Sequence, residues 1–213
     1  MHTTLPQNHP ASFWDRIAPK YAKKPVKDPT AYAEKLETVR ELVKPTDIVL
    51  ELGCGTGTTA IKLAPYVAAY TATDVSPAMI RIAEEKNSSA PVSNLRFAVA
   101  DASRVAGERP FDVVLAFSLL HLVDDLPVVL RAVHDQLRPG GFFLSKTVCL
   151  GEGNIAIRGL VRALTAVGVA PKVRSLTKDD LLGALDDARF EIDSCTQFGS
   201  GRITPFIVAR RRD

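Results

Sequence analysis

The sequence predicts an α/β protein with a seven-stranded, mostly parallel sheet, helices on both faces and a C-terminal antiparallel hairpin. Three observations support this fold class. Short apolar runs alternate with segments of helical period, which is the pattern of a parallel sheet with crossover helices. The first apolar run leads into a helix through a glycine-rich loop. The last two apolar runs, Phe190 to Phe198 and Ile203 to Ala209, follow each other without a helix and are joined by Gly199-Ser200-Gly201.

The first expected strand, Ile48 to Leu52, is followed by glycine at every second position: Gly53, Gly55 and Gly57. A strand that runs into a helix through such a loop is typical of a nucleotide-binding turn. Glycine is needed there because a side chain would block the ligand and because such turns often require positive φ.

The spacing of these glycines narrows the ligand class. A dinucleotide-binding turn has the pattern G-x-G-x-x-G, but Thr58 stands where the third glycine would be required. No lysine follows as in a Walker loop. Glu51 precedes the loop by two positions. Its charge would repel a phosphate and would suit a ligand with a positive amino group or sulfonium.

Acidic residues end the next two expected strands, Ala69 to Asp74 and Leu95 to Asp101. Ligands of open parallel sheets bind across the carboxyl ends of the strands. A carboxylate at Asp74 can accept hydrogen bonds from both hydroxyls of a ribose. The alternative is an acid that only caps the following helix, but Ser76 before Pro77 already suits that role.

Several of these segments together resemble the class I S-adenosylmethionine (SAM)-dependent methyltransferases. E-L-G-C-G-T-G resembles motif I, D-V-S-P-A-M motif II, Asp101-Ala102 motif III, and L-R-P-G-G-F-F-L a structural hallmark after a helix end. The resemblance covers about residues 45 to 210 and implies a Rossmann-like fold with SAM as cofactor. It implies that Asp74 binds the ribose, that Val75 and Met79 contact adenine, and that Asp101 and Ala102 bind the adenine edge. The expected cofactor-binding residues are Tyr21, Glu51, Gly53, Gly55, Gly57, Asp74, Val75, Met79, Asp101, Ala102 and Ser118.

The fourth expected strand, Phe111 to Ser118, is apolar throughout and leads to His121. This place corresponds to motif IV, beside the transferring methyl. It lacks the N/D-P-P-Y of amino-methylating enzymes and the Pro-Cys of cytosine C5 chemistry. It is similar to the small-molecule branch, which includes ubiquinone- and menaquinone-pathway enzymes. His121 is the catalytic candidate, as base or substrate positioner, because its ordinary pKa is near neutrality. The alternative is a histidine that caps or packs under the loop.

Two segments are expected to cover the site. Residues 1–44 form an N-terminal helical segment, loose over 1–11, in which Pro19 weakens a long helix. F-W-D-R-I-A-P-K-Y is similar to the lid of small-molecule methyltransferases, so Tyr21 is expected to touch the cofactor; an amphipathic segment that merely packs on the fold is the alternative. Residues 45–213 form the main domain. An insertion at about 150–176 carries a helix over 155–167 that is either a substrate lid or an ordinary surface helix.

The composition excludes several classes of protein. A net charge of +3, with the excess at the chain ends, is not a nucleic-acid footprint. Cys54, Cys149 and Cys195 are far apart, so neither disulfides nor a metal site is expected. No signal sequence or membrane-spanning run is present, and we expect a soluble, cytoplasmic protein without membrane insertion.

The predicted function is methyl transfer from SAM to a small-molecule acceptor, at an O, N or C atom. The alternative is a non-catalytic protein that binds SAM or S-adenosylhomocysteine (SAH), as sensor or partner subunit. A nicotinamide-dependent oxidoreductase fails on the glycine spacing and on Glu51. A nucleic-acid or protein methyltransferase is disfavoured by motif IV. The sequence specifies neither the acceptor nor the oligomeric state.

Overall fold

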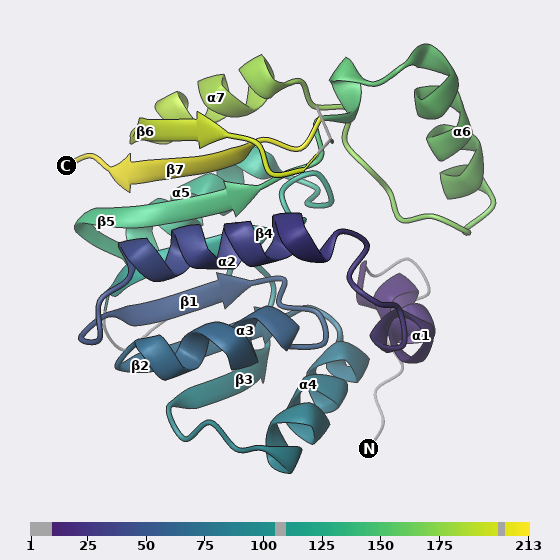
Figure 1. The fold of residues 1–213 in the computed structure, drawn as a ribbon. Coiled ribbons are helices and arrows are strands. Elements are labelled where there is room, and N and C mark those ends of the chain that lie inside the picture. The colour runs from purple at the N-terminus through teal and green to yellow at the C-terminus, as the bar shows by residue number, and fades with distance from the viewer. Residues whose placement is uncertain (1–9, 105–109, 200–202) are drawn as a thin grey trace.

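The computed structural model describes residues 10–104, 110–199 and 203–213. Its centre is a seven-stranded sheet in the order β3-β2-β1-β4-β5-β7-β6, shown in Figure 1. Only β7 runs antiparallel, to both β5 and β6, and the other pairs are parallel. The strands are β1 (Ile48–Leu52), β2 (Ala69–Asp74), β3 (Leu95–Val99), β4 (Phe111–Phe117), β5 (Leu137–Lys146), β6 (Phe190–Thr196) and β7 (Phe206–Arg211). The predicted fold class is confirmed.

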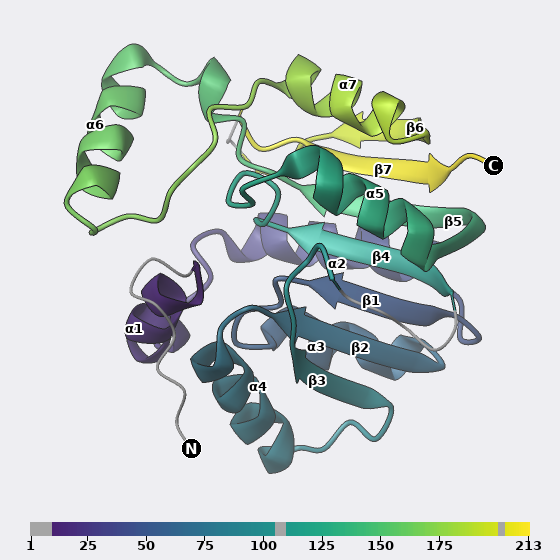
Figure 2. The same ribbon diagram turned by 180° about the vertical axis from the view of Figure 1, so that it is seen from behind.

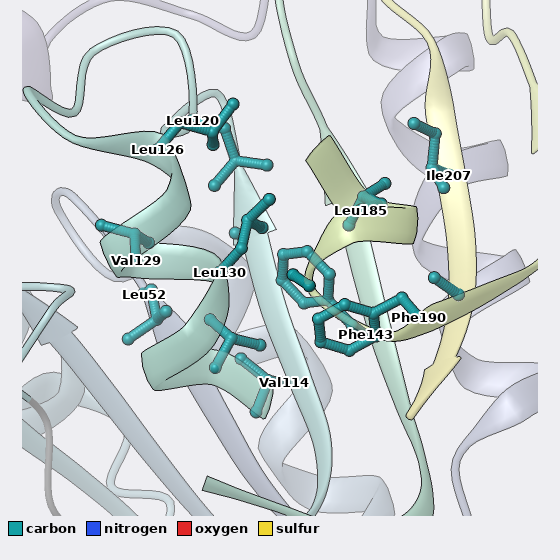
Figure 3. Close-up of a cluster of buried hydrophobic side chains, with 14 of the residues drawn as sticks. Leu52, Val114, Leu120, Leu126, Val129, Leu130, Phe143, Leu185, Phe190 and Ile207 are labelled. Atoms are coloured by element: carbon teal, nitrogen blue, oxygen red, sulfur yellow. The ribbon is translucent and has the colours of Figure 1, made fainter. Parts of the chain in front are cut away.

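Helices cover both faces of this sheet (Figures 1 and 2). They are α1 (Pro10–Ala22), α2 (Pro29–Leu42), α3 (Thr58–Leu63), α4 (Pro77–Ser89), α5 (Leu126–Gln136), α6 (Ile155–Ala166) and α7 (Lys178–Asp187), with short 3-10 turns at Ala64–Tyr66 and Leu150–Glu152. Side chains of α5 and α7 form one core cluster with the sheet, and side chains of α2 and α3 form a second. Figure 3 shows the first cluster, in which Leu130 of α5 and Leu185 of α7 lie with Phe143 and Phe190 of the strands.

The N-terminal helix is longer than the sequence suggests. The expectation that residues up to 11 are loose is wrong for Pro10 and Ala11, which lie in α1, and residues 1–9 are outside the described part. The helix also continues through Pro19. Ala18 is fully buried against α4, and this packing offsets the backbone hydrogen bond that proline removes.

Pairing between strands moves several predicted bounds. Strand β5 begins at Leu137, which pairs with Phe111, and the next pair, Val113 with Phe142, shows that the extra residues of this irregularity lie in β5. The third strand ends at Val99 rather than Asp101, so that acid lies in the loop after it. The last two strands are β6 and β7, and the predicted connection overlaps residues 200–202, which are not among those described.

Two helices lie beyond the carboxyl ends of the strands. Figures 1 and 2 both place α1 and α6 on this side of the sheet. Asn154 caps α6 by accepting from the Ala156 backbone N–H, and Thr177 and Asp180 form a capping box at the start of α7. Helices α1 and α6, which do not cover a face of the sheet, therefore both lie at the carboxyl ends of its strands.

Candidate active site

A pocket of about 250 Å³ lies at the carboxyl ends of the parallel strands. Of the twelve predicted site residues, those that line it are Tyr21, Gly53, Gly55, Asp74, Val75, Met79, Asp101, Ala102 and Ser118. The structure thus brings together residues from α1, the glycine loop and the ends of β2, β3 and β4. Three other predicted residues, Glu51, Gly57 and His121, are not among those that line it.

The glycine loop bends sharply at the edge of the pocket. Gly53 and Gly55 have φ values of 67° and 55°, in the left-handed region that disfavours other residues. A Cβ on Gly53 would lie 2.9 Å from Leu119 Cδ1, so the loop also needs glycine for close packing. Gly57 has a different role, because a Cβ there would lie 2.7 Å from the Cβ of Ala83 on α4. Gly57 therefore allows α3 and α4 to approach.

Asp74 is held at the end of β2 by two backbone donors. Its Oδ2 accepts from the Gly55 N–H at 2.9 Å, and its Oδ1 accepts from the Ser76 N–H at 2.9 Å. Burial raises the pKa of Asp74, and these two hydrogen bonds oppose that shift. Each carboxylate oxygen has a further lone pair beyond these bonds. Asp74 can therefore accept two more hydrogen bonds from a ligand in the pocket.

Asp101 lies in the loop after β3 and is exposed. Its Oδ1 accepts from the Ser103 N–H at 2.8 Å and from the Ser103 hydroxyl at 2.5 Å. These bonds shape a tight turn and orient the carboxylate at the pocket wall. Asp101 can therefore bind a ligand only through the lone pairs that these two hydrogen bonds do not use.

Helix α1 is fixed over the pocket by a carboxylate. Asp15 Oδ1 accepts from the Ser76 hydroxyl at 2.6 Å and from the Ala78 N–H at 3.0 Å, at the first turn of α4. Tyr21, two turns after Trp14, lies over the loop, with its Cε1 3.8 Å from where a Gly55 Cβ would be. Partial burial and the Asp74 charge raise the pKa of the Tyr21 phenol. Tyr21 therefore lines the pocket beside the glycine loop.

Trp14 also lines the pocket, although the sequence did not single it out as a site residue. Its ring packs edge-to-face with that of Tyr21, at 6.4 Å between centroids. The available signal was the seven-residue spacing, which puts both rings on one side of a helix. Leu119 and Leu122 after β4 were missed as well, because they follow a strand end without any periodic pattern.

Glu51 lies behind the pocket rather than in its wall. Its side chain is buried and accepts from the Tyr70 hydroxyl at 2.9 Å. Burial raises its pKa to about 7, while the Tyr70 hydrogen bond and nearby Lys35 oppose the shift. Burial lowers the pKa of Lys35 to about 8, and its ammonium lies 4.0 Å from the centroid of the Phe117 ring. Because Phe117 lines the pocket, Glu51 and Lys35 support the site from underneath.

His121 is buried in the loop after β4. Burial lowers its pKa to about 4, so the imidazole is neutral at pH 7. Its Nδ1 has no hydrogen-bond partner among the described residues. The His121 carbonyl accepts from the Arg174 N–H at 2.8 Å, which ties the segment after α6 to this loop.

Ser118 carries backbone strain at the pocket. Its φ is 57°, an uncommon value for a residue other than glycine. The Ser118 N–H donates to the Lys146 carbonyl at 2.6 Å, which holds the chain at the end of β4. Strained residues of this kind are concentrated at functional sites. No group of three or more potential metal-ligating side chains occurs in the described ranges.

Known proteins have sequences similar to the part of the chain that forms this site. Residues 50–143, which include the glycine loop, Asp74 and Asp101, match a family model described as a methyltransferase domain. Over this part of its length the chain is similar to the class I methyltransferases. The predicted resemblance is confirmed.

Proteins similar to this chain include a ubiquinone biosynthesis O-methyltransferase of Methylobacterium nodulans. The two are 30% identical over 154 residues, covering 70% of this chain and 61% of the relative. The iterative polyketide synthase afoE of Emericella nidulans is 35% identical over 124 residues, covering 53% of this chain and 4% of the synthase. The chain therefore spans less than two thirds of the length of these relatives.

Solved structures share the fold. The N-methyltransferase NodS of Bradyrhizobium japonicum in complex with S-adenosyl-l-homocysteine has a TM-score of 0.71 at 16% identity, covering 97% of this chain and 100% of NodS. The [4+2]-cyclase SpnF has a TM-score of 0.76 at 18% identity, covering 95% of this chain and 94% of the cyclase. At such identities the likeness concerns the fold alone.

Proposed function

We propose that this protein transfers a methyl group from SAM to a small-molecule acceptor by direct in-line displacement. The proposal rests on the position and hydrogen bonding of the Asp74 carboxylate. Its carboxylate lines the pocket beside the glycine loop and has acceptor capacity on both oxygens after binding Gly55 and Ser76. Two adjacent acceptors match the two adjacent hydroxyls of a ribose.

The other lining residues fit the remaining parts of SAM. Val75 and Met79 offer apolar contact for an adenine ring, and Asp101 and Ala102 border the same wall. Gly53 and Gly55 leave room for the methionine part. When bound, SAM supplies a methyl group activated by the sulfonium. The chain's own residues would orient that methyl and, through Trp14 and Tyr21, exclude water from it.

The proposal assigns His121 a positioning role. A buried imidazole with a pKa of about 4 is a weak base at neutral pH, because efficient bases have a pKa near the working pH. His121 instead joins the loop after β4 to the segment after α6 through its carbonyl. Among the roles that a histidine can take at a strand end, substrate or loop positioning fits this environment best.

The acceptor is proposed to be a small, partly apolar molecule. Leu119, Leu122 and Val123 give the loop after β4 an aliphatic pocket wall. The M. nodulans relative is named as an enzyme of ubiquinone biosynthesis, which is consistent with a small-molecule acceptor. In this proposal α1 and the 150–176 segment are the covering elements of the site.

A second candidate is a protein that binds SAM or SAH without transferring the methyl group. It is favoured by the position of His121, which does not line the pocket. The cofactor-binding residues are common to both candidates. Only a measurement of methyl transfer separates them.

Isothermal titration with SAM, SAH and NADH tests the cofactor. Binding of both adenosyl ligands is expected because Asp74 can accept from ribose hydroxyls. No binding of NADH is expected, because Thr58 stands where a dinucleotide-binding turn requires its third glycine. Absence of adenosyl binding would refute both candidates. Transfer of label from methyl-labelled SAM to a panel of small phenols, amines and quinols then distinguishes an enzyme from a binding protein.

A further inference from the structure

Exposed apolar side chains are concentrated on α6 and the turn that follows it. Ten large hydrophobic residues are exposed in the described part of the chain, and five of them belong to α6 and the turn after it. These five are Ile155, Ile157, Leu160, Val167 and Val169, exposed by 50 to 82%. Scattered apolar residues on a surface need no explanation, but a cluster indicates an interaction site.

Helix α6 is amphipathic and has no buried residue. Ile157, Leu160 and Leu164 recur at intervals of three and four, so they share one side of the helix. Arg158 and Arg162 are four residues apart and share the other side. A helix with aliphatic residues on one side and arginines on the other is typical of helices that lie in a membrane interface.

Two segments on this side of the molecule carry only basic charges. Residues 16–27 hold five basic and no acidic side chains, and residues 153–178 also hold five basic and no acidic ones. The whole chain has a net charge of only +3, so the remainder is net negative. Lys172 is paired with Asp124 at 3.0 Å. Arg158 and Arg162 have no carboxylate partner within the described ranges.

These two basic segments adjoin each other. The Arg16 guanidinium of α1 donates to the Gly168 carbonyl, just after α6, at 2.6 Å. Figures 1 and 2 both show α1 and α6 on the side to which the parallel strands point. Trp14 and Tyr21 of α1 line the pocket. The basic, apolar surface therefore lies beside the pocket.

We propose that α6 and residues 16–27 dock this protein on an anionic lipid surface. The aliphatic side chains would enter the boundary of the acyl chains, and the arginines and lysines would bind the headgroups. A lipid surface is favoured over a protein partner because the large hydrophobic residues exposed on α6 are all aliphatic, whereas the centres of protein interfaces are enriched in aromatic residues. Within the described residues no helix is suited to crossing a bilayer, so the attachment is peripheral.

Co-sedimentation with vesicles tests this inference, and it needs neither SAM nor an acceptor. The protein should bind vesicles of phosphatidylglycerol mixed with phosphatidylcholine. Binding to pure phosphatidylcholine, or to the mixed vesicles at high salt, should be much weaker. Absence of binding to the anionic vesicles at low salt would overturn the proposal and leave the proposed methyl transfer untouched.

Two pairs of substitutions separate the two contributions. Arg158→Glu with Arg162→Glu should weaken vesicle binding by at least about 25-fold, because each basic residue near an anionic surface contributes about five-fold. Ile157→Ser with Leu160→Ser should also weaken it, by about ten-fold or more, through lost apolar burial. Both pairs are exposed, so folding should be unaffected.

The matched control reverses two exposed arginines elsewhere, Arg81→Glu on α4 with Arg131→Glu on α5, and changes the net charge equally. This control should reduce vesicle binding far less than Arg158→Glu with Arg162→Glu does. Equal loss in both would show that only net charge matters and would refute the assignment to α6. A dimer in solution that Ile157→Ser with Leu160→Ser dissociates would instead identify the surface as a contact between copies, and would also refute it.

Discussion

Helices α1 and α6 have similar patterns and different environments. Both are amphipathic, and both lie beyond the carboxyl ends of the strands. Ala11 and Ala18 of α1 are fully buried, whereas no residue of α6 is. Apolar periodicity therefore predicted two helices but did not predict which of them has a partner surface.

The two helices differ in burial because each has a different surface to pack against. Ala18 is small enough to let α1 approach Ala78 and Met79 of α4 closely, and Asp15 binds the first turn of the same helix. The segment after helix α6 is attached by two hydrogen bonds, from Arg16 to Gly168 and from Arg174 to His121. A packed face and a half-buried polar anchor fix α1, whereas α6 keeps its apolar side for another contact.

The largest effect is expected from a charge in the packed contact. Ala18→Asp would bury an unpaired carboxylate and should cost up to about 3 kcal/mol, either as lost global stability or as detachment of α1. SAM binding should fall too, since Trp14 and Tyr21 leave the pocket. The matched Ala163→Asp on exposed α6 should change the free energy of unfolding by no more than about 0.5 kcal/mol. Urea denaturation measures both, and equal effects would contradict the comparison.

Burial of the His121 side chain, in the loop to which the segment after α6 is tied, should make the stability of the protein depend on pH. The folded pKa of His121, about 4, lies below the ordinary 6.5, so the unfolded chain binds the proton more tightly. The free energy of unfolding should therefore be unaffected by this residue above pH 6.5 and fall by about 3 kcal/mol as the pH drops to 4.

His121→Leu should remove that part of the pH dependence while keeping the stability at pH 7. The measurement is the difference between wild type and variant in urea midpoints across this pH window. A difference that does not change with pH would show that His121 is accessible to protons in the folded state. Labelled methyl transfer by the same variant tests its positioning role, which predicts reduced turnover with SAM affinity nearly unchanged.

The side of the pocket covered by α1 is expected to be the cofactor side. Asp74→Ala should weaken SAM binding by about 1–3 kcal/mol, because a charge-assisted hydrogen bond is lost. Asp135→Ala, at an exposed carboxylate of α5, is the control and should leave the affinity unchanged. Titration calorimetry gives both values, and unaltered binding by the Asp74 variant would remove it from the ribose site.

The smallest effects are expected at the two caps. Asp15→Ala removes two acceptor contacts to the start of α4 and should lower global stability by about 1 kcal/mol. Asn154→Ala removes the cap of α6, and its cost should remain local because that helix has no buried residue. Hydrogen exchange of α6 amides against a urea curve separates these cases. A global loss from Asn154→Ala would mean that α6 is coupled to the core.

Local patterns determined much of the fold. The predicted strands Ile48–Leu52 and Ala69–Asp74 have the bounds of β1 and β2, because apolar runs there end at turn-forming residues. The early start of β5 was not predictable, since it depends on pairing with Phe111, which is remote in sequence. Secondary structure follows from local periodicity, whereas the extent of a strand depends on its neighbour.

For the site, the sequence by itself determined that acids and glycines end adjacent strands, because parallel strands bring their carboxyl ends to one edge. It therefore located Asp74, Asp101 and the loop at one pocket. Only the tertiary structure decided that Glu51 points to Tyr70 and that His121 is buried with a lowered pKa. The direction of a side chain and the dielectric around it depend on elements packed against it from distant parts of the chain. That is also why α1 is fixed over the pocket while α6 remains exposed.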